Sequence, residues 1–161
     1  MHKVVFLRHG QSVWNKDNLF TGWVDVGLSQ KGKKEAKEAG VLIKKAGFKF
    51  DLAFCSVLKR AKQTLKIVLK ELSQTNLPQE FAWQLNERHY GALQGRNKKE
   101  TVKKFGEEQT QIWRRSFKTK PPQLKKTDKF YPGMTESQLP LSESLEDTFN
   151  RVIPYWQKWY A

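Results

Sequence analysis

Hydrophobic residues follow two different spacings along the chain. Short, largely apolar runs, typical of buried strands, lie at residues 4–7, within 51–56 and at 81–85. Over residues 30–46 and 58–72, apolar residues instead recur every three or four positions, which predicts two helices that each bury one face. Strands that alternate with helices predict an α/β fold with a mostly parallel sheet and helices on both faces.

Residues that favour helix ends mark some of these boundaries. Ser29 offers an N-cap for the first helix, and Gly47 offers a stop after it. Further along, residues 98–117 have a polar, helical pattern. Residues 118–141 are rich in Pro and Lys, which predicts a surface loop or lid.

A last helix is predicted near the end of the chain, capped by Ser142 or Ser144 and kinked at Pro154. Its apolar side would consist of Leu145, Phe149, Val152, Ile153 and Trp156. No internal repeat and no Gly/Ser linker divides the sequence, so we expect one domain over residues 1–161.

The charge balance favours anionic partners. Among 161 residues, 30 are Lys or Arg and 16 are Asp or Glu, which gives a formal net charge of +14. Such a field attracts nucleic acids or phosphorylated metabolites, although lysines on helix faces are also the usual solvated surface. Trp14, Trp23 and Trp83 do not form the stacking series of a nucleic-acid surface, so we expect small molecules and no nucleic acid.

The single cysteine, Cys55, excludes an intrachain disulfide and a zinc site built from several thiolates. No stretch approaches the roughly 20 apolar residues that cross a bilayer, and the start lacks the hydrophobic segment of a signal peptide. We therefore expect a cytoplasmic protein with no membrane partner.

Charged residues follow the predicted strands. Arg8 and His9 come directly after the first run, and Arg60 opens the second helix. Glu87 and Arg88 follow the third run. Because ligands collect at the carboxyl ends of parallel strands, these side chains are expected along one edge of the sheet. A guanidinium holds a phosphate while a neutral imidazole attacks phosphorus and a carboxyl moves the proton, so the pattern predicts phosphoryl transfer.

Each of these residues also has a purely structural interpretation. Arg8 and His9 would then be a surface pair, and Arg60 would be a solvent-facing helix residue. Glu87 would form a structural ion pair with Arg88.

Longer blocks of sequence favour the catalytic interpretation. They are FLRHG at residues 6–10, WN at 14–15, FTGW at 20–23, SVLKRA at 56–61, LNERHYGALQG at 85–95, WRR at 113–115 and RVIPYW at 151–156. On these blocks the chain resembles the cofactor-dependent (2,3-bisphosphoglycerate-dependent) phosphoglycerate mutases, members of the histidine phosphatase superfamily, over nearly its whole length.

The resemblance implies a role for each matching residue. His9 would be phosphorylated during turnover, and Glu87, which also contacts substrate, would be the general acid and base. The transferring phosphoryl group and the substrate would be held by Arg8, Ser12, Asn15, Thr21, Gly22 and Arg60. The other phosphate and the carboxylate of phosphoglycerate would be bound by Arg88, Tyr90, Lys98, Arg114 and Arg115.

The implied reaction is the interconversion of 2-phosphoglycerate and 3-phosphoglycerate in glycolysis and gluconeogenesis. It would run through a phosphohistidine, with 2,3-bisphosphoglycerate as primer and bound intermediate and without a metal. The same resemblance implies a homo-oligomer.

The sequence departs from the family pattern at three places. Gln11 replaces the usual Glu, and the loop at residues 134–138 is short. After the last helix the family continues into a strand with a second catalytic histidine in a His-Gly-Asn motif, which this sequence lacks, so we expect the C-terminal part of the family domain to be absent. Three activities stay open: an impaired mutase, a phosphatase that loses the phosphoryl group to water, and an inactive anion-binding remnant.

Overall fold

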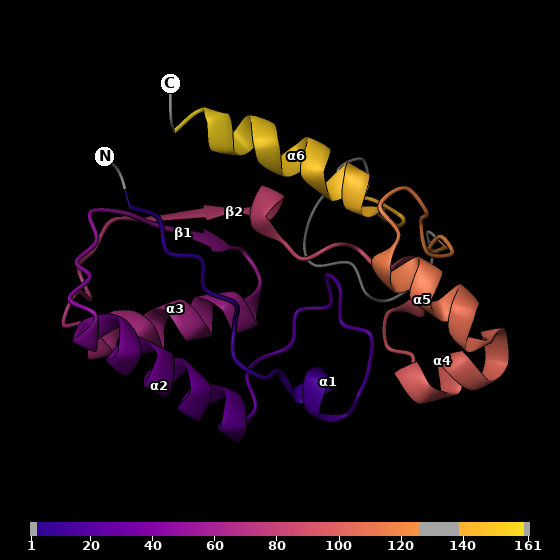
Figure 1. Cartoon of the computed structure of the whole chain (residues 1–161), viewed down its shortest axis with the longest axis horizontal. Coiled ribbons are helices and arrows are strands. Elements are labelled where there is room, and N and C mark those ends of the chain that lie inside the picture. Colours follow the sequence, from indigo (N-terminus) through magenta and orange to yellow (C-terminus); the bar gives the residue numbers. More distant parts are fainter. Residues whose placement is uncertain (1–2, 126–138, 160–161) are drawn as a thin grey trace.

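The computed structural model describes residues 3–125 and 139–159 and has the predicted α/β architecture. Strands β1 (Ala53–Ser56) and β2 (Gln79–Ala82) form a small parallel sheet, in which Ala53 pairs with Gln79 and Ser56 with Ala82. Helix α3 (Lys59–Glu71) makes the crossover between the two strands. Figure 1 shows α2 and α3 on one side of the sheet and α6 on the other.

Helix α2 (Gln30–Lys45) begins where the sequence predicts, since the Ser29 side chain accepts a hydrogen bond from the Gly32 amide. It packs closely on α3 through a small residue: a Cβ on Gly40 would lie 2.8 Å from the Cβ of Glu71. Of the predicted apolar stripe on α3, Val68 is buried, and Ala61 is only partly covered.

The first predicted strand is wrong. Residues 4–7 have no regular structure, and Phe6 is 85% exposed. An apolar run becomes a strand only when its backbone pairs with a neighbour, and no strand in the described parts of the chain pairs with this one. The third predicted strand is shifted: β2 ends at Ala82, and Trp83–Leu85 is a 3₁₀ turn, η1.

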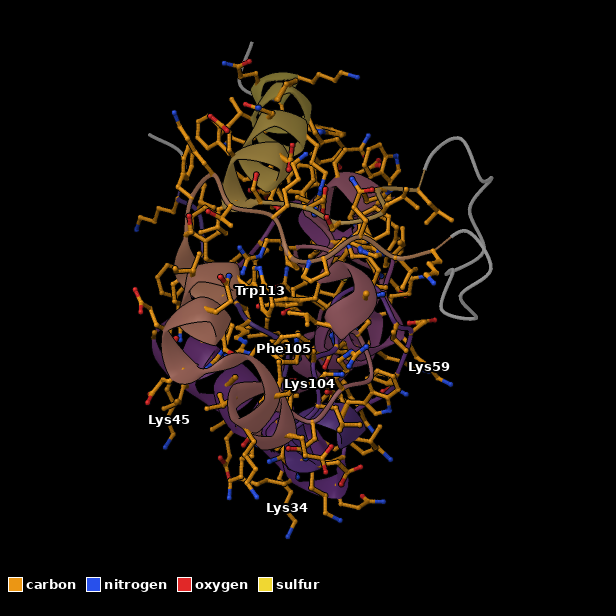
Figure 2. The ribbon with its side chains drawn as sticks, turned by 90° about the vertical axis from the view of Figure 1, so that its right-hand side faces the viewer. Lys34, Lys45, Lys59, Lys104, Phe105 and Trp113 are labelled. Atoms are coloured by element: carbon orange, nitrogen blue, oxygen red, sulfur yellow. The ribbon has the colours of Figure 1, made fainter. Side chains whose placement is uncertain are left out.

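The predicted helical stretch 98–117 is two helices, α4 (Lys98–Phe105) and α5 (Glu107–Arg115), which meet at Gly106 with a φ of 82°. Only glycine adopts that left-handed geometry without strain, so the pattern is helical but the helix is not continuous. The rings of Phe105 and Trp113 pack edge to face between the two helices, with centroids 5.2 Å apart (Figure 2).

The last helix, α6 (Leu145–Gln157), begins at Ser144, whose side chain accepts from the Asp147 amide in a capping box. It continues through Pro154. Most of the predicted loop or lid lies outside the described residues. None of the described helices has the length and hydrophobicity needed to span a membrane.

Two short elements complete the part of the fold that carries the site. Helix α1 (Val13–Lys16) follows the Arg8-His9 segment, and the 3₁₀ turn η2 (Gly91–Leu93) follows the loop after η1. Trp23 and His89 are fully buried against each other, with ring centroids 5.6 Å apart. The fold therefore stacks the chain around residue 23 directly against the chain around residue 89.

Candidate active site

His9 is held with one ring nitrogen free to react. Its Nδ1 donates a hydrogen bond to the Gly10 carbonyl at 2.7 Å, so the proton is on Nδ1 and Nε2 keeps its lone pair. The Gly10 amide donates to the Thr64 hydroxyl on α3 at 3.2 Å, which fixes the segment on that helix. Glycine is required there, because a Cβ on Gly10 would lie 2.2 Å from the Gly32 carbonyl oxygen.

Burial keeps this imidazole neutral. Desolvation lowers the pKa of His9 below its usual 6.5, and the positive charge of Arg60 lowers the pKa further. The Gly10 hydrogen bond and the Glu87 carboxylate act in the opposite direction but do not reverse the shift. At neutral pH the ring is therefore neutral, with an unprotonated Nε2 that is able to act as a nucleophile.

Arg60 connects His9 to the candidate acid. Its side chain is 1% exposed, its Nε donates to His9 Nε2 at 3.2 Å, and its Nη2 donates to Glu87 Oε2 at 3.0 Å. The carbonyls of Gly22 and Val24 accept from the same guanidinium at 2.7 and 3.0 Å. The alternative prediction of a solvent-facing arginine is wrong.

The structure pairs Glu87 with Arg60 instead of Arg88, so the alternative ion pair with the neighbouring arginine is also wrong. The Glu87 side chain is 35% exposed, which leaves its carboxyl open to solvent and substrate. Arg88 points elsewhere: its guanidinium lies 5.0 Å from the Tyr90 ring and donates to the Arg114 carbonyl at 2.7 Å.

A cavity of about 1210 Å³ joins most of the predicted site residues. Those that line it are Arg8, His9, Asn15, Thr21, Arg60, Glu87, Tyr90, Lys98, Arg114 and Arg115. The cavity extends from these polar residues along residues 4–7 and β1, where its walls are apolar. Residues separated by more than 100 positions in sequence thus face one space.

Three predicted site residues do not line this cavity. Ser12 caps α1 and exchanges hydrogen bonds with Asn15, Gly22 supplies a carbonyl to Arg60, and Arg88 is 5% exposed behind Tyr90. Gly22 has a φ of 54°, and a Cβ there would lie 2.2 Å from Gln94 Oε1. Their contact with a substrate stays a prediction, whereas the structure shows them supporting neighbours that do line the cavity.

Lys98, Arg114 and Arg115 bring a second group of positive charges to the cavity. Burial lowers the pKa of Lys98, and the nearby charge of Arg114 lowers it further. Within the described residues these three side chains form no salt bridge with a carboxylate. The Glu87 carboxylate acts on the pKa of Lys98 in the opposite direction but does not reverse its shift, so this group of cations still favours an anion.

Some supporting groups were not found from the sequence. The Gly10 carbonyl and Thr64 fix His9, but neither a main-chain acceptor nor an isolated helix threonine carries a sequence signal. Arg151 lies in a block that carried the resemblance, yet no role was assigned to it. The described residues contain no cluster of three or more His, Cys, Asp or Glu that could hold a metal ion.

Solved structures of known proteins have a similar fold. Three similar solved structures are a putative alpha-ribazole-5'-P phosphatase from Escherichia coli (24% identity, TM-score 0.66), a phosphoglycerate mutase from Thermus thermophilus (23%, 0.62) and a mycobacterial glucosyl-3-phosphoglycerate phosphatase (23%, 0.69). The matches cover 96%, 93% and 93% of this chain but 65%, 68% and 59% of those chains.

These structures share the fold, and the chain spans about two thirds of their length. Their different activities do not select one substrate. The sequence itself matches the family described as "Histidine phosphatase superfamily (branch 1)" over residues 4–160. The chain belongs to the histidine phosphatase superfamily, branch 1.

Proposed function

We propose that this protein transfers phosphoryl groups through a phosphohistidine formed at Nε2 of His9. The single observation that carries the proposal is the position of Arg60, which contacts both the free His9 Nε2 and the Glu87 carboxylate. A nucleophile, a cation for the phosphoryl oxygens and a proton carrier are thereby held around one point.

The proposed step is an in-line displacement. The lone pair of His9 Nε2 attacks phosphorus, the N–P bond forms, and the P–O bond to the substrate breaks. Glu87, first protonated from solvent, gives that proton to the departing oxygen, while Arg8 and Arg60 balance the charge on the phosphoryl oxygens. In the second half the phosphoryl group leaves His9 for a hydroxyl, and Glu87 takes that hydroxyl's proton.

The substrate that we propose is phosphoglycerate, interconverted between its 2-phospho and 3-phospho forms with 2,3-bisphosphoglycerate as primer. This substrate has two anionic ends, and the cavity has two groups of cations. Arg8 and Arg60 would hold one phosphate beside His9, while Lys98, Arg114 and Arg115 would hold the other phosphate or the carboxylate. The family resemblance and one of the similar structures support the same substrate.

A phosphatase is the second candidate. It differs only in the acceptor, which is water instead of a substrate hydroxyl. The exposed fraction of Glu87, 35%, favours it, because water reaches the carboxyl that would activate it. Two of the three similar structures described above are phosphatases by name.

The test is incubation with 2,3-bisphosphoglycerate labelled with ³²P, followed by three readouts. We expect an acid-labile label on the wild-type chain and none on His9→Ala. Lys34→Ala is the matched control, since this exposed lysine on α2 projects into solvent (Figure 2). Absence of label on the wild-type chain contradicts the phosphohistidine.

The other two readouts separate the candidates. Conversion of 3-phosphoglycerate to 2-phosphoglycerate, with only trace primer present, supports the mutase. Release of inorganic phosphate without isomerisation supports the phosphatase. If neither product forms but 2,3-bisphosphoglycerate raises the Tm, the result supports an anion-binding remnant.

A further inference from the structure

Arg151 projects from α6 onto the main chain that carries Glu87. Its Nη1 donates to the Gln84 carbonyl at 2.5 Å, and its Nη2 donates to the carbonyls of Asn86 at 2.9 Å and Glu87 at 3.2 Å. The side chain is 9% exposed. One guanidinium therefore binds three carbonyls within four consecutive residues.

Glu143 supplies the counter-charge to Arg151 and binds the same stretch of main chain. We call the Arg151–Glu143 pair the clamp. Its carboxylate accepts from Arg151 Nε at 2.6 Å and from Nη2 at 3.0 Å. The same carboxylate accepts from the His89 amide at 2.9 Å, and the Glu143 amide donates to the His89 carbonyl at 2.9 Å. Positions 84, 86, 87 and 89 are thus all fixed by this pair.

The clamp acts on the backbone of Glu87 and leaves its carboxyl free. Residues 87–90 have no regular secondary structure, so no strand ladder or helix fixes their direction. The Glu87 carbonyl accepts from Arg151 and, at 2.5 Å, from Trp23 Nε1, while its carboxylate extends the other way to Arg60. Since the peptides on either side of Glu87 are held, the direction of its side chain is set.

We infer that Arg151, oriented by Glu143, is a positioning residue that holds residues 84–87 so that the Glu87 carboxyl faces Arg60 and His9. This rests on the proposed function, in which Glu87 protonates the leaving oxygen. Arg151 lines no part of the cavity, so it acts through the backbone and not on the substrate. The competing interpretation is that Arg151 only attaches α6 to the rest of the fold.

Leaving-group dependence separates the two interpretations. An alkyl phosphate such as 2,3-bisphosphoglycerate needs a proton on its departing oxygen, whereas the nitrophenolate leaving from p-nitrophenyl phosphate needs none. Loss of a positioned acid slows only the first reaction, by a factor on the order of 100. Loss of folded protein lowers both reactions equally.

The test measures single-turnover phosphorylation of His9 by both donors. In Arg151→Lys the charge remains, but one ammonium cannot replace the fork that binds three carbonyls and a carboxylate. We expect phosphorylation by 2,3-bisphosphoglycerate to fall about 10- to 100-fold, and phosphorylation by p-nitrophenyl phosphate less than about 3-fold. Asn150→Ala, an exposed neighbour on α6, is the control and should behave as wild type.

Glu87→Gln gives the reference for a selective loss, and circular dichroism at the assay temperature reports folding. If Arg151→Lys does not fold, Glu143→Gln takes its place, because it weakens the orientation of Arg151 and keeps the acceptor oxygen. Suppose that Glu87→Gln slows phosphorylation by 2,3-bisphosphoglycerate selectively, while Arg151→Lys or Glu143→Gln slows phosphorylation by both donors equally. That result overturns this inference and leaves the proposed function standing. A wild-type chain that is phosphorylated by neither donor overturns the proposed function.

Discussion

Two contacts determine which nitrogen of His9 carries the proton, one with the next residue and one with a residue far along the chain. The Gly10 carbonyl, on the next residue, accepts a hydrogen bond from Nδ1–H, which keeps the proton on Nδ1 and leaves Nε2 unprotonated. Arg60, 51 residues away, then donates to that bare nitrogen. A donor at Nε2 is compatible only with the tautomer that the Gly10 carbonyl selects, so the two contacts reinforce each other.

We predict that the His9 imidazole titrates below pH 6.5. Burial and the Arg60 charge lower the pKa of His9, so the ring stays neutral while an exposed histidine is already taking up its proton. The measurement is an NMR titration of the ring resonances, assigned by comparison with His9→Ala. In concentrated urea the same resonances should return to a midpoint near 6.5.

A midpoint at or above 6.5 in the folded protein would contradict this environment. The lowered pKa of His9 also predicts how the rate of phosphorylation depends on pH. Phosphorylation of His9 requires the neutral ring. With p-nitrophenyl phosphate as donor, which needs no proton from Glu87, the rate should fall only in acid, below the range in which a free histidine loses its nucleophilicity.

At this scale the sequence predicted which charged side chains meet in the candidate site but not the groups that support them. The separate blocks around His9, Arg60 and Glu87 contain the residue types that phosphoryl transfer needs, and the structure brings these three together. The Gly10 carbonyl escaped prediction because every residue has a carbonyl, and only the fold decides which one faces a ring. A substrate contact was predicted for Arg88, Arg114 and Arg115 alike, but of these three only Arg114 and Arg115 line the cavity.

At the scale of secondary structure, helices were predicted more accurately than strands, of which only the one within residues 51–56 lies where the pattern predicts it. The spacing of apolar residues and the Ser29 and Ser144 caps located α2 and α6, because capping depends on residues within one turn. The run at residues 4–7 has the composition of a strand, but a strand depends on a distant pairing partner that local composition does not contain. Its side chains instead line the cavity beside β1.

The contact between α2 and the segment after His9 gives a prediction at the same scale. In an ordinary helix, Gly→Ala stabilises by about 1 kcal/mol. At Gly32 the new Cβ would lie 2.0 Å from the Gln11 carbonyl oxygen, a backbone atom that cannot move away alone. We expect Gly32→Ala to reverse the usual sign and destabilise the fold by about 1–3 kcal/mol, measured by urea unfolding.

Lys33→Ala is the matched control for that change. It follows Gly32 on α2, its side chain is exposed, and its substitution should alter stability by no more than about 0.5 kcal/mol. If Gly32→Ala unfolds at the same urea concentration as the wild-type chain or at a higher one, the close contact does not exist. Since Gln11 lies two residues after His9, the variant should also slow phosphorylation of that histidine.

At the scale of the whole molecule, one buried histidine lies where distant segments meet. His89 is fully buried against Trp23, its Nδ1 accepts from the Gly91 amide at 3.0 Å, and its main chain is hydrogen-bonded to Glu143. Burial, with a further contribution from the Arg151 charge, lowers the pKa of His89 to about 4. Protonation of this ring therefore opposes the packing of α6 and the residue 84–89 loop against the segment around Trp23.

The direction in which stability changes with pH follows from the pKa of His89 in the folded and unfolded protein. The unfolded imidazole takes up its proton near pH 6.5 and the folded one near pH 4. Stability from this residue is therefore complete above about pH 6.5 and is lost progressively down to about pH 4, by about 3 kcal/mol at most. The free energy of unfolding, measured by urea titration at several pH values, should show this loss.

His89→Asn isolates that contribution, because its amide oxygen replaces the Nδ1 acceptor and does not titrate. The substitution removes the ring packing against Trp23 at every pH. It therefore lowers the free energy of unfolding by an amount that does not depend on pH. We expect its stability curve to fall less steeply than the wild-type curve between pH 6.5 and 4, so that the two curves converge in acid. Carboxylates and His9 titrate equally in both proteins and cancel in the difference, so parallel curves would contradict a neutral, buried His89.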